Sequence, residues 1–207
     1  MVTQKKIKKA FANFMSPKGI ARYPRLDQPY TYSQAQGRSV PDAVNGSFDT
    51  SLLVPIKEAQ PMIEQINATI KEAGITPEFL PYREHVEKET GEKTGQIEFK
   101  FKAYGRLKNG SPNKILFFDA KGRPVQSDLY LTSGSTIRCL GYISVSQKSA
   151  RLNLKEVQVI DLIERSASGF DAVDGGTFMA DEDDNNNNTA VSFANAASPQ
   201  ADERPAF

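Results

Sequence analysis

Two stretches of the chain, residues 97–106 and 137–145, alternate apolar residues with cationic or aromatic ones. In the first stretch the odd positions through 103 are Ile, Phe, Phe and Ala, and the second repeats this spacing of two. Successive side chains of a strand point to opposite faces, so each stretch is predicted to be a strand with one apolar face. The opposite faces carry cations and rings: Lys100, Lys102, Tyr104, Arg106, Arg138 and Tyr142.

Cations and flat rings on one surface suit an unpaired polynucleotide. Cations attract its phosphates, and each base that stacks on an aromatic ring contributes about 1–3 kcal/mol. Stacking needs an open π-face and no particular base edge, so such binding is largely independent of sequence. A further group of these residues lies in an extended segment, because Pro24 and Pro29 disfavour helix there. This group consists of Arg22, Arg25, Tyr30 and Tyr32.

The charge of the chain changes sign along its length. Residues 1–165 contain 25 Lys and Arg against 17 Asp and Glu, a net charge of +8. Residues 166–207 contain one Arg against eight acids, a net charge of −7. A basic surface attracts polyanions, and an acidic tail on the same molecule can occupy that surface when no polyanion is bound.

The residue inventory argues against an enzyme and against a metal or other cofactor. One histidine, His85, and one cysteine, Cys139, cannot build the usual zinc sites, and no phosphate-binding glycine loop of the Walker type occurs. The lone cysteine excludes an internal disulfide and suits a reducing cytosol. No apolar run of about 20 residues occurs, so no membrane span or membrane partner is expected.

The remaining pattern predicts a mainly β fold with one helix. Residues 46–55 are predicted to form the first strand. A helix is predicted to begin at Pro61 and to end at Gly74. Residues 4–15 have helix-like apolar spacing, and residues 76–96 are predicted to be loop. The parity of apolar positions changes at Lys155–Glu156, which predicts a β-bulge in the last strand. The other strands are predicted at 97–106, 114–119, 137–145 and 152–163; five strands with one helix favour a small Greek-key barrel.

Composition divides the chain into three parts. Residues 1–27 are predicted to be a basic N-terminal arm, and residues 28–168 to be the barrel domain. Residues 169–207 are rich in Asn, Ala, Ser and Asp, a composition that cannot bury enough apolar surface to offset the entropy of ordering. We therefore predict a disordered acidic tail that ends in Phe207.

Several segments together resemble the replication single-stranded DNA-binding proteins of tailed bacteriophages. In chain order, these segments are Pro29–Tyr32, Ile97–Gly105, the Asp119–Gly122 turn, Ser133–Arg138 and Arg151–Leu162. The resemblance covers roughly residues 28–165 together with the acidic, Phe-terminated tail. It implies a five-stranded OB-fold barrel with a helix inserted after its first strand.

The same resemblance implies a function and partners. Members of that family coat single-stranded DNA during phage DNA replication, recombination and repair, here in the host cell cytoplasm. Their C-terminal aromatic residue docks a DNA polymerase and a primase-helicase, which would assign this role to Asp202, Glu203 and Phe207. Exchange of the tail between two chains offers one route to a homodimer.

Two other functions fit the residues alone, because Lys and Tyr are also ordinary residues on a solvent-facing strand. One is an RNA-binding OB-fold protein of the cold-shock type. The other is a protein–protein adaptor whose barrel binds an acidic peptide.

Overall fold

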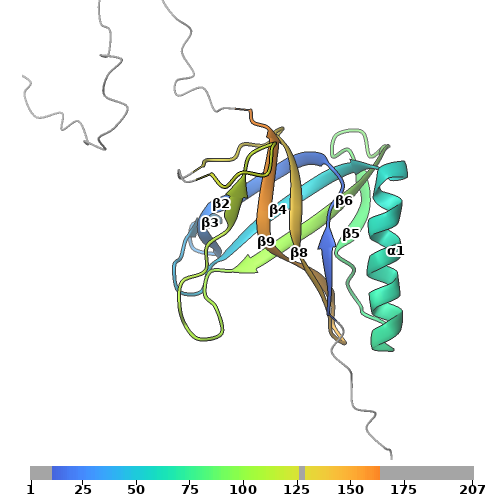
Figure 1. Ribbon diagram of the computed structural model, residues 1–207, viewed down its shortest axis with the longest axis horizontal. Helices are drawn as coiled ribbons and strands as arrows, with labels where there is room; N and C mark the ends of the chain where they lie inside the picture. The colour runs from blue at the N-terminus through green and yellow to red at the C-terminus, as the bar shows by residue number, and fades with distance from the viewer. Residues whose placement is uncertain (1–10, 126–128, 164–207) are drawn as a thin grey trace, which may run out of the picture. The chain divides into compact units, whose positions relative to one another are not determined.

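The computed structural model describes residues 11–125 and 129–163, which form a mainly β fold with one helix, α1 (Ile56–Ala73) (Figure 1). The strands of this part of the chain are β1 (Phe11–Met15), β2 (Gly19–Ser33), β3 (Arg38–Pro41), β4 (Ser47–Pro55), β5 (Tyr82–Val86), β6 (Lys93–Tyr104), β7 (Leu116–Phe118), β8 (Thr136–Val145) and β9 (Ala150–Asp161). Within the described ranges, no helix is long and apolar enough to cross a membrane.

The strands form one mixed sheet in the order β1-β8-β2-β4-β6-β9-β7, with β3 on β2 and β5 on β6. Strand β8 also pairs with β9. In the series β2, β4, β6, β9 and β8, each strand therefore pairs with the next, and the last pairs with the first. The β6–β9 and β7–β9 pairs are parallel and the others antiparallel. The predicted number of five strands is wrong for the described residues, because short strands also pair at the edges. The predicted first strand is the fourth, β4, and the helix follows it.

The period-two pattern is confirmed in the long strands. In β6 the side chains of Phe99 and Phe101 are fully buried, and in β8 those of Ile137, Cys139 and Ile143 are as well. The parity change in β9 is a bulge, as predicted: Leu140 pairs with Glu156 but Gly141 pairs with Leu154, which leaves Lys155 as the extra residue. The predicted strand at 114–119 is confined to the three residues of β7.

The helix begins at Ile56, five residues before Pro61, so the predicted start is wrong. Burial explains the difference, since Ala59 already packs into the core with Met62 and Ile66 and extends the apolar stripe toward the N-terminus. Gly74 ends the helix as predicted, with a left-handed φ of 65°. Figure 1 shows α1 along one side of the sheet.

The helix-like spacing of residues 4–15 is misleading for residues 11–15, which form β1. This segment pairs with β8 from Phe11 opposite Ser144 to Met15 opposite Leu140. It also buries Phe14, whose ring centroid lies 5.7 Å from that of Phe101. Most of residues 11–27 of the predicted N-terminal arm therefore lie in the sheet, in β1 and the start of β2, both of which pair with β8. Residues 1–10 lie outside the described part.

The predicted loop at 76–96 contains β5 and the start of β6. The two strands pair antiparallel, with Tyr82 opposite Phe99 and Val86 opposite Lys93. The side chains of β5 (Tyr-Arg-Glu-His-Val) are mostly exposed, so the strand needs few apolar residues. Its charged sequence therefore lacks the apolar alternation that predicts a strand. The predicted disordered tail, residues 169–207, lies outside the described residues.

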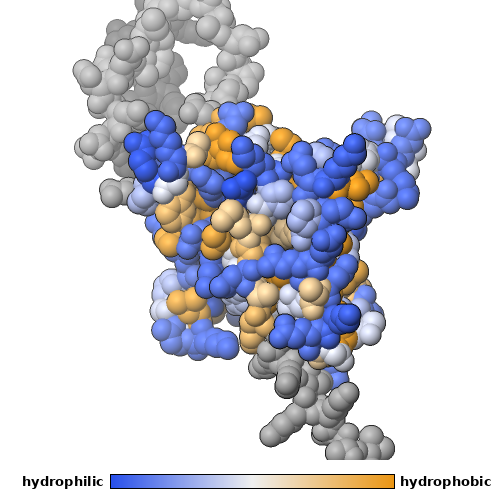
Figure 2. Space-filling model, turned by 45° about the vertical axis from the view of Figure 1, so that its right-hand side comes forward, coloured by the Kyte–Doolittle hydropathy of each residue, from blue (hydrophilic) through white to orange (hydrophobic). Residues whose placement is uncertain are grey.

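Hydrophobic side chains (orange) form small patches between hydrophilic ones (blue) on the face seen in Figure 2. Mixed patches of this kind are ordinary on a protein surface. The arrangement of individual cations and rings is therefore more informative than surface hydropathy.

Candidate nucleic-acid interface

The solvent-facing side of β2, β4 and β6 brings together cations that are far apart in the sequence. Side chains directly opposite each other on paired strands project from the same face. Two cross-strand rows result, Arg22–Ser51–Lys100 and Arg25–Asp49–Lys102. The alternate residues of β4 and β6 pair core side chains, such as Thr50 with Phe101 and Leu52 with Phe99. We call the solvent side the β2–β4–β6 face.

The second row continues across the parallel junction into the other half of the sheet. Lys102 of β6 pairs with Asn153 of β9, and Asn153 pairs with Tyr142 of β8. The row therefore runs through five strands as Arg25–Asp49–Lys102–Asn153–Tyr142. Cations at one end and a ring at the other lie on one continuous surface.

Tyr104, Arg106 and Tyr142 line a cavity of about 490 Å³, which we call the Tyr104–Tyr142 groove. The other polar side chains of its wall include Lys108, Asn113, Lys114, Asn153, Lys155 and Glu156. The structure thus places two predicted stacking rings and one predicted cation around a single hollow. Cations outnumber the one acid in this wall, which favours an anionic ligand.

The two rings of the groove are held by specific contacts. The Tyr104 side chain is 58% exposed, and its hydroxyl accepts a hydrogen bond from Arg151 Nη1 at 2.8 Å. The Tyr142 ring centroid lies 6.0 Å from that of Phe11 and 5.5 Å from Lys155 Nζ. Such support lowers the entropy that a base would have to overcome on stacking.

Arg106 lies beyond the end of β6 and not on the strand face predicted for it. Its Nε donates to the Ala43 carbonyl at 3.2 Å, and its Nη1 donates to the Gly110 carbonyl at 2.9 Å. Arg106 forms an isolated bridge with Pro112, and between them lies the predicted Asn109–Gly110 turn, where Gly110 takes a left-handed φ of 82°. In this position Arg106 lines the groove.

Acids on the β2–β4–β6 face are paired with its cations. Asp49 Oδ1 lies 4.0 Å from Arg25 Nε, and Glu98 Oε2 lies 2.6 Å from Arg83 Nη2. Burial opposes ionisation of Glu98, but hydrogen bonds from Arg83 and Ser51 and the charges of Arg83 and Arg22 outweigh it. The pKa of this carboxyl therefore lies below its ordinary value. Both acids reduce the net positive charge of the face.

Arg22 is oriented by two neighbours on the same surface. Its guanidinium carbon lies 5.1 Å from the centroid of the Tyr23 ring, and its Nη1 contacts His85 Nε2. Tyr23 has a positive φ of 47°, an uncommon conformation for a residue other than glycine. It is 56% exposed, so a further ring is displayed beside the cations.

Tyr30 and Tyr32 lie toward the end of β2 that pairs with β3. Tyr30 pairs with Ser47, and Ser47 pairs with Tyr104. The Tyr30 hydroxyl donates a hydrogen bond to Asp27 Oδ2 at 3.0 Å. Burial, followed by the contact with Asp27, raises the pKa of Tyr30. Tyr32 is 65% exposed and pairs with Ser39.

Arg138 is a predicted site residue that belongs neither to the row nor to the lining of the Tyr104–Tyr142 groove. It lies on β8 four residues before Tyr142, and its Nη1 contacts Met15 Sδ at 3.5 Å. Within residues 11–125 and 129–163, the buried Arg138 Nε has no hydrogen-bond partner. The predicted tail residues Asp202, Glu203 and Phe207 lie outside the described residues.

Sequence reasoning missed three polar residues of β9 that belong to this surface: Arg151, Asn153 and Lys155. They alternate with buried Leu152 and Leu154, so the period-two signal that located the other sites was present. Phe11 was missed for another reason. Its place beside Tyr142 depends on the long-range pairing of β1 with β8, which local pattern does not reveal.

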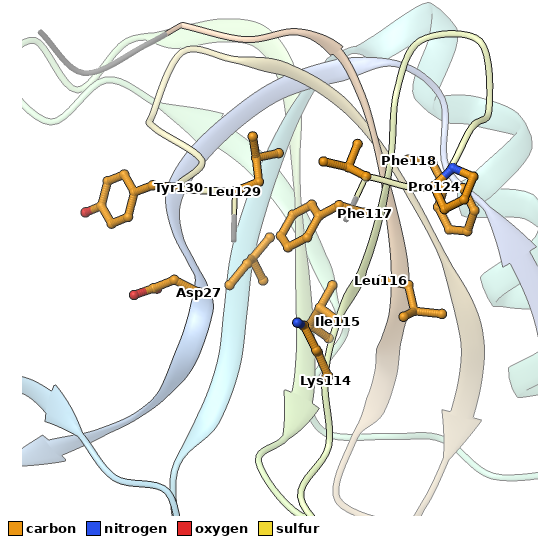
Figure 3. A pocket seen from close by; sticks show the side chains of 11 residues that line it. Asp27, Lys114, Ile115, Leu116, Phe117, Phe118, Pro124, Leu129 and Tyr130 are labelled. Atoms are coloured by element: carbon orange, nitrogen blue, oxygen red, sulfur yellow. The ribbon is translucent and has the colours of Figure 1, made fainter. Parts of the chain in front are cut away.

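A second cavity, of about 450 Å³, adjoins the groove, since Lys114 and Leu116 line both cavities. Figure 3 shows Asp27 and Tyr130 on one side of it and Leu116, Phe118 and Pro124 on the opposite side. Most of its lining residues are apolar, whereas charged and polar residues are more numerous around the Tyr104–Tyr142 groove.

No protein-family model matches the chain, and no curated protein matches it significantly. Solved structures are similar in fold. The single-stranded DNA-binding protein gp2.5 of bacteriophage T7 superposes with a TM-score of 0.53 at 18% identity, covering 78% of this chain and 98% of that one. A C-terminally truncated single-stranded DNA-binding protein of bacteriophage Enc34 has a TM-score of 0.52 at 14% identity, covering 73% and 87%. The chain therefore shares the fold of these phage proteins.

Proposed function

We propose that this protein binds single-stranded DNA without sequence preference, as a non-enzymatic coat in phage DNA replication and recombination in the host cytoplasm. The observation that carries the proposal is the five-stranded row from Arg25 through Lys102 to Tyr142. A row that carries two cations and ends at a groove with two rings offers contacts to both the phosphates and the unpaired bases of one strand. The fold shared with two phage single-stranded DNA-binding proteins supports the same function.

Each side chain has a role in this proposal. The cations of the face contact phosphates, and the rings of the groove stack on bases. Lys100, Lys102, Arg22 and Arg25 are assigned to phosphates, with Arg106 at the mouth of the groove. Tyr104 and Tyr142 are assigned to bases, with Tyr30 and Tyr32 further along β2. Arg138 is assigned a phosphate outside the row.

The pairings of β2, β4, β6, β9 and β8 support an OB-fold barrel as the scaffold, with β1, β3, β5 and β7 as additions. OB-folds bind oligonucleotides on a strand surface that combines a basic groove with stacking rings. On this assignment β2 is the first strand of the barrel and β4 its second, so α1 follows the second strand.

The tail is proposed to recruit replication proteins. Its acidic residues Asp202 and Glu203 and the ring of Phe207 would present a charged and an aromatic contact to a DNA polymerase or a primase-helicase. The same acids would compete with DNA for the basic face, because a tethered competitor acts at high effective concentration.

A titration with single-stranded DNA, duplex DNA and RNA of equal length tests the proposal. Single-stranded DNA should bind most tightly, because the bases of a duplex offer no open faces for stacking. Tighter binding of RNA would favour the cold-shock type of function. Failure of the full chain to bind any polynucleotide at moderate salt would overturn the proposal in favour of the adaptor.

A further inference from the structure

A third cavity, of about 420 Å³, lies beside β6 on the same surface as the cations. We call it the Phe79 pocket; its wall includes Ser51, Phe79, Leu80, Tyr82, Arg83 and Lys100. Its volume falls within the roughly 300–1,000 Å³ of small-ligand sites. Because Ser51 and Lys100 form the row with Arg22, this pocket is continuous with the β2–β4–β6 face.

The pocket displays two adjacent apolar side chains on a fixed backbone. Phe79 is 61% exposed and Leu80 is 48% exposed. The Phe79 N–H donates to the Lys148 carbonyl at 3.1 Å, and the Phe79 carbonyl accepts from the Ala150 N–H at 3.0 Å. Two residues later, the Pro81 carbonyl accepts from the Lys100 N–H at 2.8 Å. The segment is thus anchored to β6 and to the β8–β9 turn while the Phe79 ring stays open to solvent.

Charges around this ring favour a nucleotide. Lys100, Arg83 and Glu98 all form part of the wall, and the Arg83 guanidinium is bound to Glu98. An exposed ring with a lysine beside it offers a stacking surface and a phosphate contact together. Neither residue type needs a particular base.

We propose that the Phe79 pocket is a base-binding subsite, in which the Phe79 ring stacks on an unpaired base and Lys100 contacts a neighbouring phosphate. This inference rests on the proposed single-stranded DNA binding and deepens it by assigning the path of the strand. From the Tyr104–Tyr142 groove the strand passes along β6, over Lys102 and Lys100, to Phe79. Lys100 and Tyr104 are four residues apart on β6, so their Cα atoms are separated by roughly 13 Å. Only an oligonucleotide of several nucleotides reaches both ends.

The first test compares three variants of the full chain: Phe79→Ala, Phe79→Leu and Phe79→Tyr. Each is titrated with labelled oligo(dT) of increasing length, and thermal melting checks the fold. Phe79→Ala should weaken binding of the longer oligonucleotides about 5- to 150-fold, the equivalent of about 1–3 kcal/mol for one stacked base. Phe79→Leu should bind nearly as weakly as Phe79→Ala, because it keeps apolar area without a π-face. Phe79→Tyr should bind like the wild type.

Length separates this subsite from the groove. The shortest oligonucleotides that bind should be unaffected by Phe79→Ala, because they can occupy the Tyr104–Tyr142 groove alone. An equal loss at every length would overturn the proposed path. Full binding by Phe79→Leu would overturn stacking.

A second test starts with the wild-type protein, and that first part does not depend on how the variants fold. A long oligonucleotide is scanned with a single abasic position, and affinity should fall at two separate regions, one for each subsite. With the Phe79→Ala variant, an abasic position should no longer lower the affinity at one of these regions. The stacking contact there is lost whether the Phe79 ring or the base is removed. A single region of loss in the wild type would overturn the inference.

The outcomes distinguish this inference from the function on which it rests. If the wild-type protein binds no single-stranded DNA, the proposed function itself fails. If the wild type binds and a folded Phe79→Ala variant binds equally well at every length, only the Phe79 subsite is refuted.

Discussion

The Arg151 guanidinium on β9 donates a hydrogen bond to the Tyr104 hydroxyl on β6 at 2.8 Å. The bond links two strands that pair in parallel at Phe101 and Leu152, three residues from Tyr104. It fixes the outer edge of an exposed ring and places a cation beside it. Ring and cation therefore act as one unit of the Tyr104–Tyr142 groove.

The first prediction concerns this unit. Tyr104→Ala should weaken binding of single-stranded DNA by about 1–3 kcal/mol, because one stacking surface is lost. Tyr104→Phe keeps the π-face and loses only the bond to Arg151, so its loss should be smaller, about 0.5–1.5 kcal/mol. The chain has no Trp, and quenching of tyrosine emission on DNA addition measures the affinity. Unchanged binding by folded Tyr104→Ala would show that the ring is not a base contact.

The second prediction concerns salt. If four to six phosphates are neutralised, log K against log[salt] should have a slope of roughly −3 to −4, since each contact on a single strand contributes about −0.7. Lys102→Ala should reduce the magnitude of that slope by about 0.7. Lys57→Ala is the matched control, because Lys57 is exposed on α1. Retained affinity with no salt response would contradict the electrostatic part of the proposal.

The third prediction concerns Asp49, which lies between Arg25 and Lys102 across three strands. Asp49→Asn removes a negative charge from the centre of the row and should strengthen DNA binding. The gain should be of the size measured for exposed charge pairs, about 0.2–1 kcal/mol, and should shrink as salt rises. Glu64→Gln on α1 makes the same change of charge away from the row and should have little effect. Equal gains from both variants would mean that net charge alone matters.

The fourth prediction concerns the pH dependence of stability. Because the pKa of folded Glu98 lies below its ordinary 4.5, the stability from its ionisation is fully present above that value. It is lost as the pH falls through the lower pKa of the folded state. The wild type should therefore exceed Glu98→Gln in free energy of unfolding above about pH 5, and this difference should shrink as the pH falls below the ordinary pKa of the carboxyl. Denaturant unfolding at several pH values measures it, and a difference constant with pH would contradict the role of Glu98.

The fifth prediction separates two roles of the tail. Deleting residues 177–207 removes six acidic side chains and one arginine, so affinity for single-stranded DNA should rise, most clearly at low salt. Deleting Phe207 alone should leave that affinity nearly unchanged and weaken association with a polymerase or helicase, where an aromatic anchor is expected to matter most. DNA titration and pull-down with purified partners measure the two effects. Lower DNA affinity after the long deletion would contradict the competitor role.

The sequence by itself determined the elements whose pattern is local. Alternation along β6 and β8 indicates one apolar face and one polar face, so Lys100, Lys102, Tyr104 and Tyr142 could be assigned to solvent before any pairing was known. The β9 bulge at Lys155 followed from the same logic, because a change of parity within one apolar face needs an extra residue. The end of α1 at Gly74 followed from the conformational freedom of glycine.

Only the tertiary structure decided which strands lie next to each other. Strand β1 forms because β8 has an edge to pair with, and β5 forms because β6 does, although the segment of β1 has helical spacing and that of β5 is highly charged. The row from Arg25 to Tyr142 and the nearness of Arg151 to Tyr104 depend on cross-strand register over long separations in sequence. Local patterns set which face a side chain takes, whereas its neighbours on that face are chosen by the pairing of distant strands.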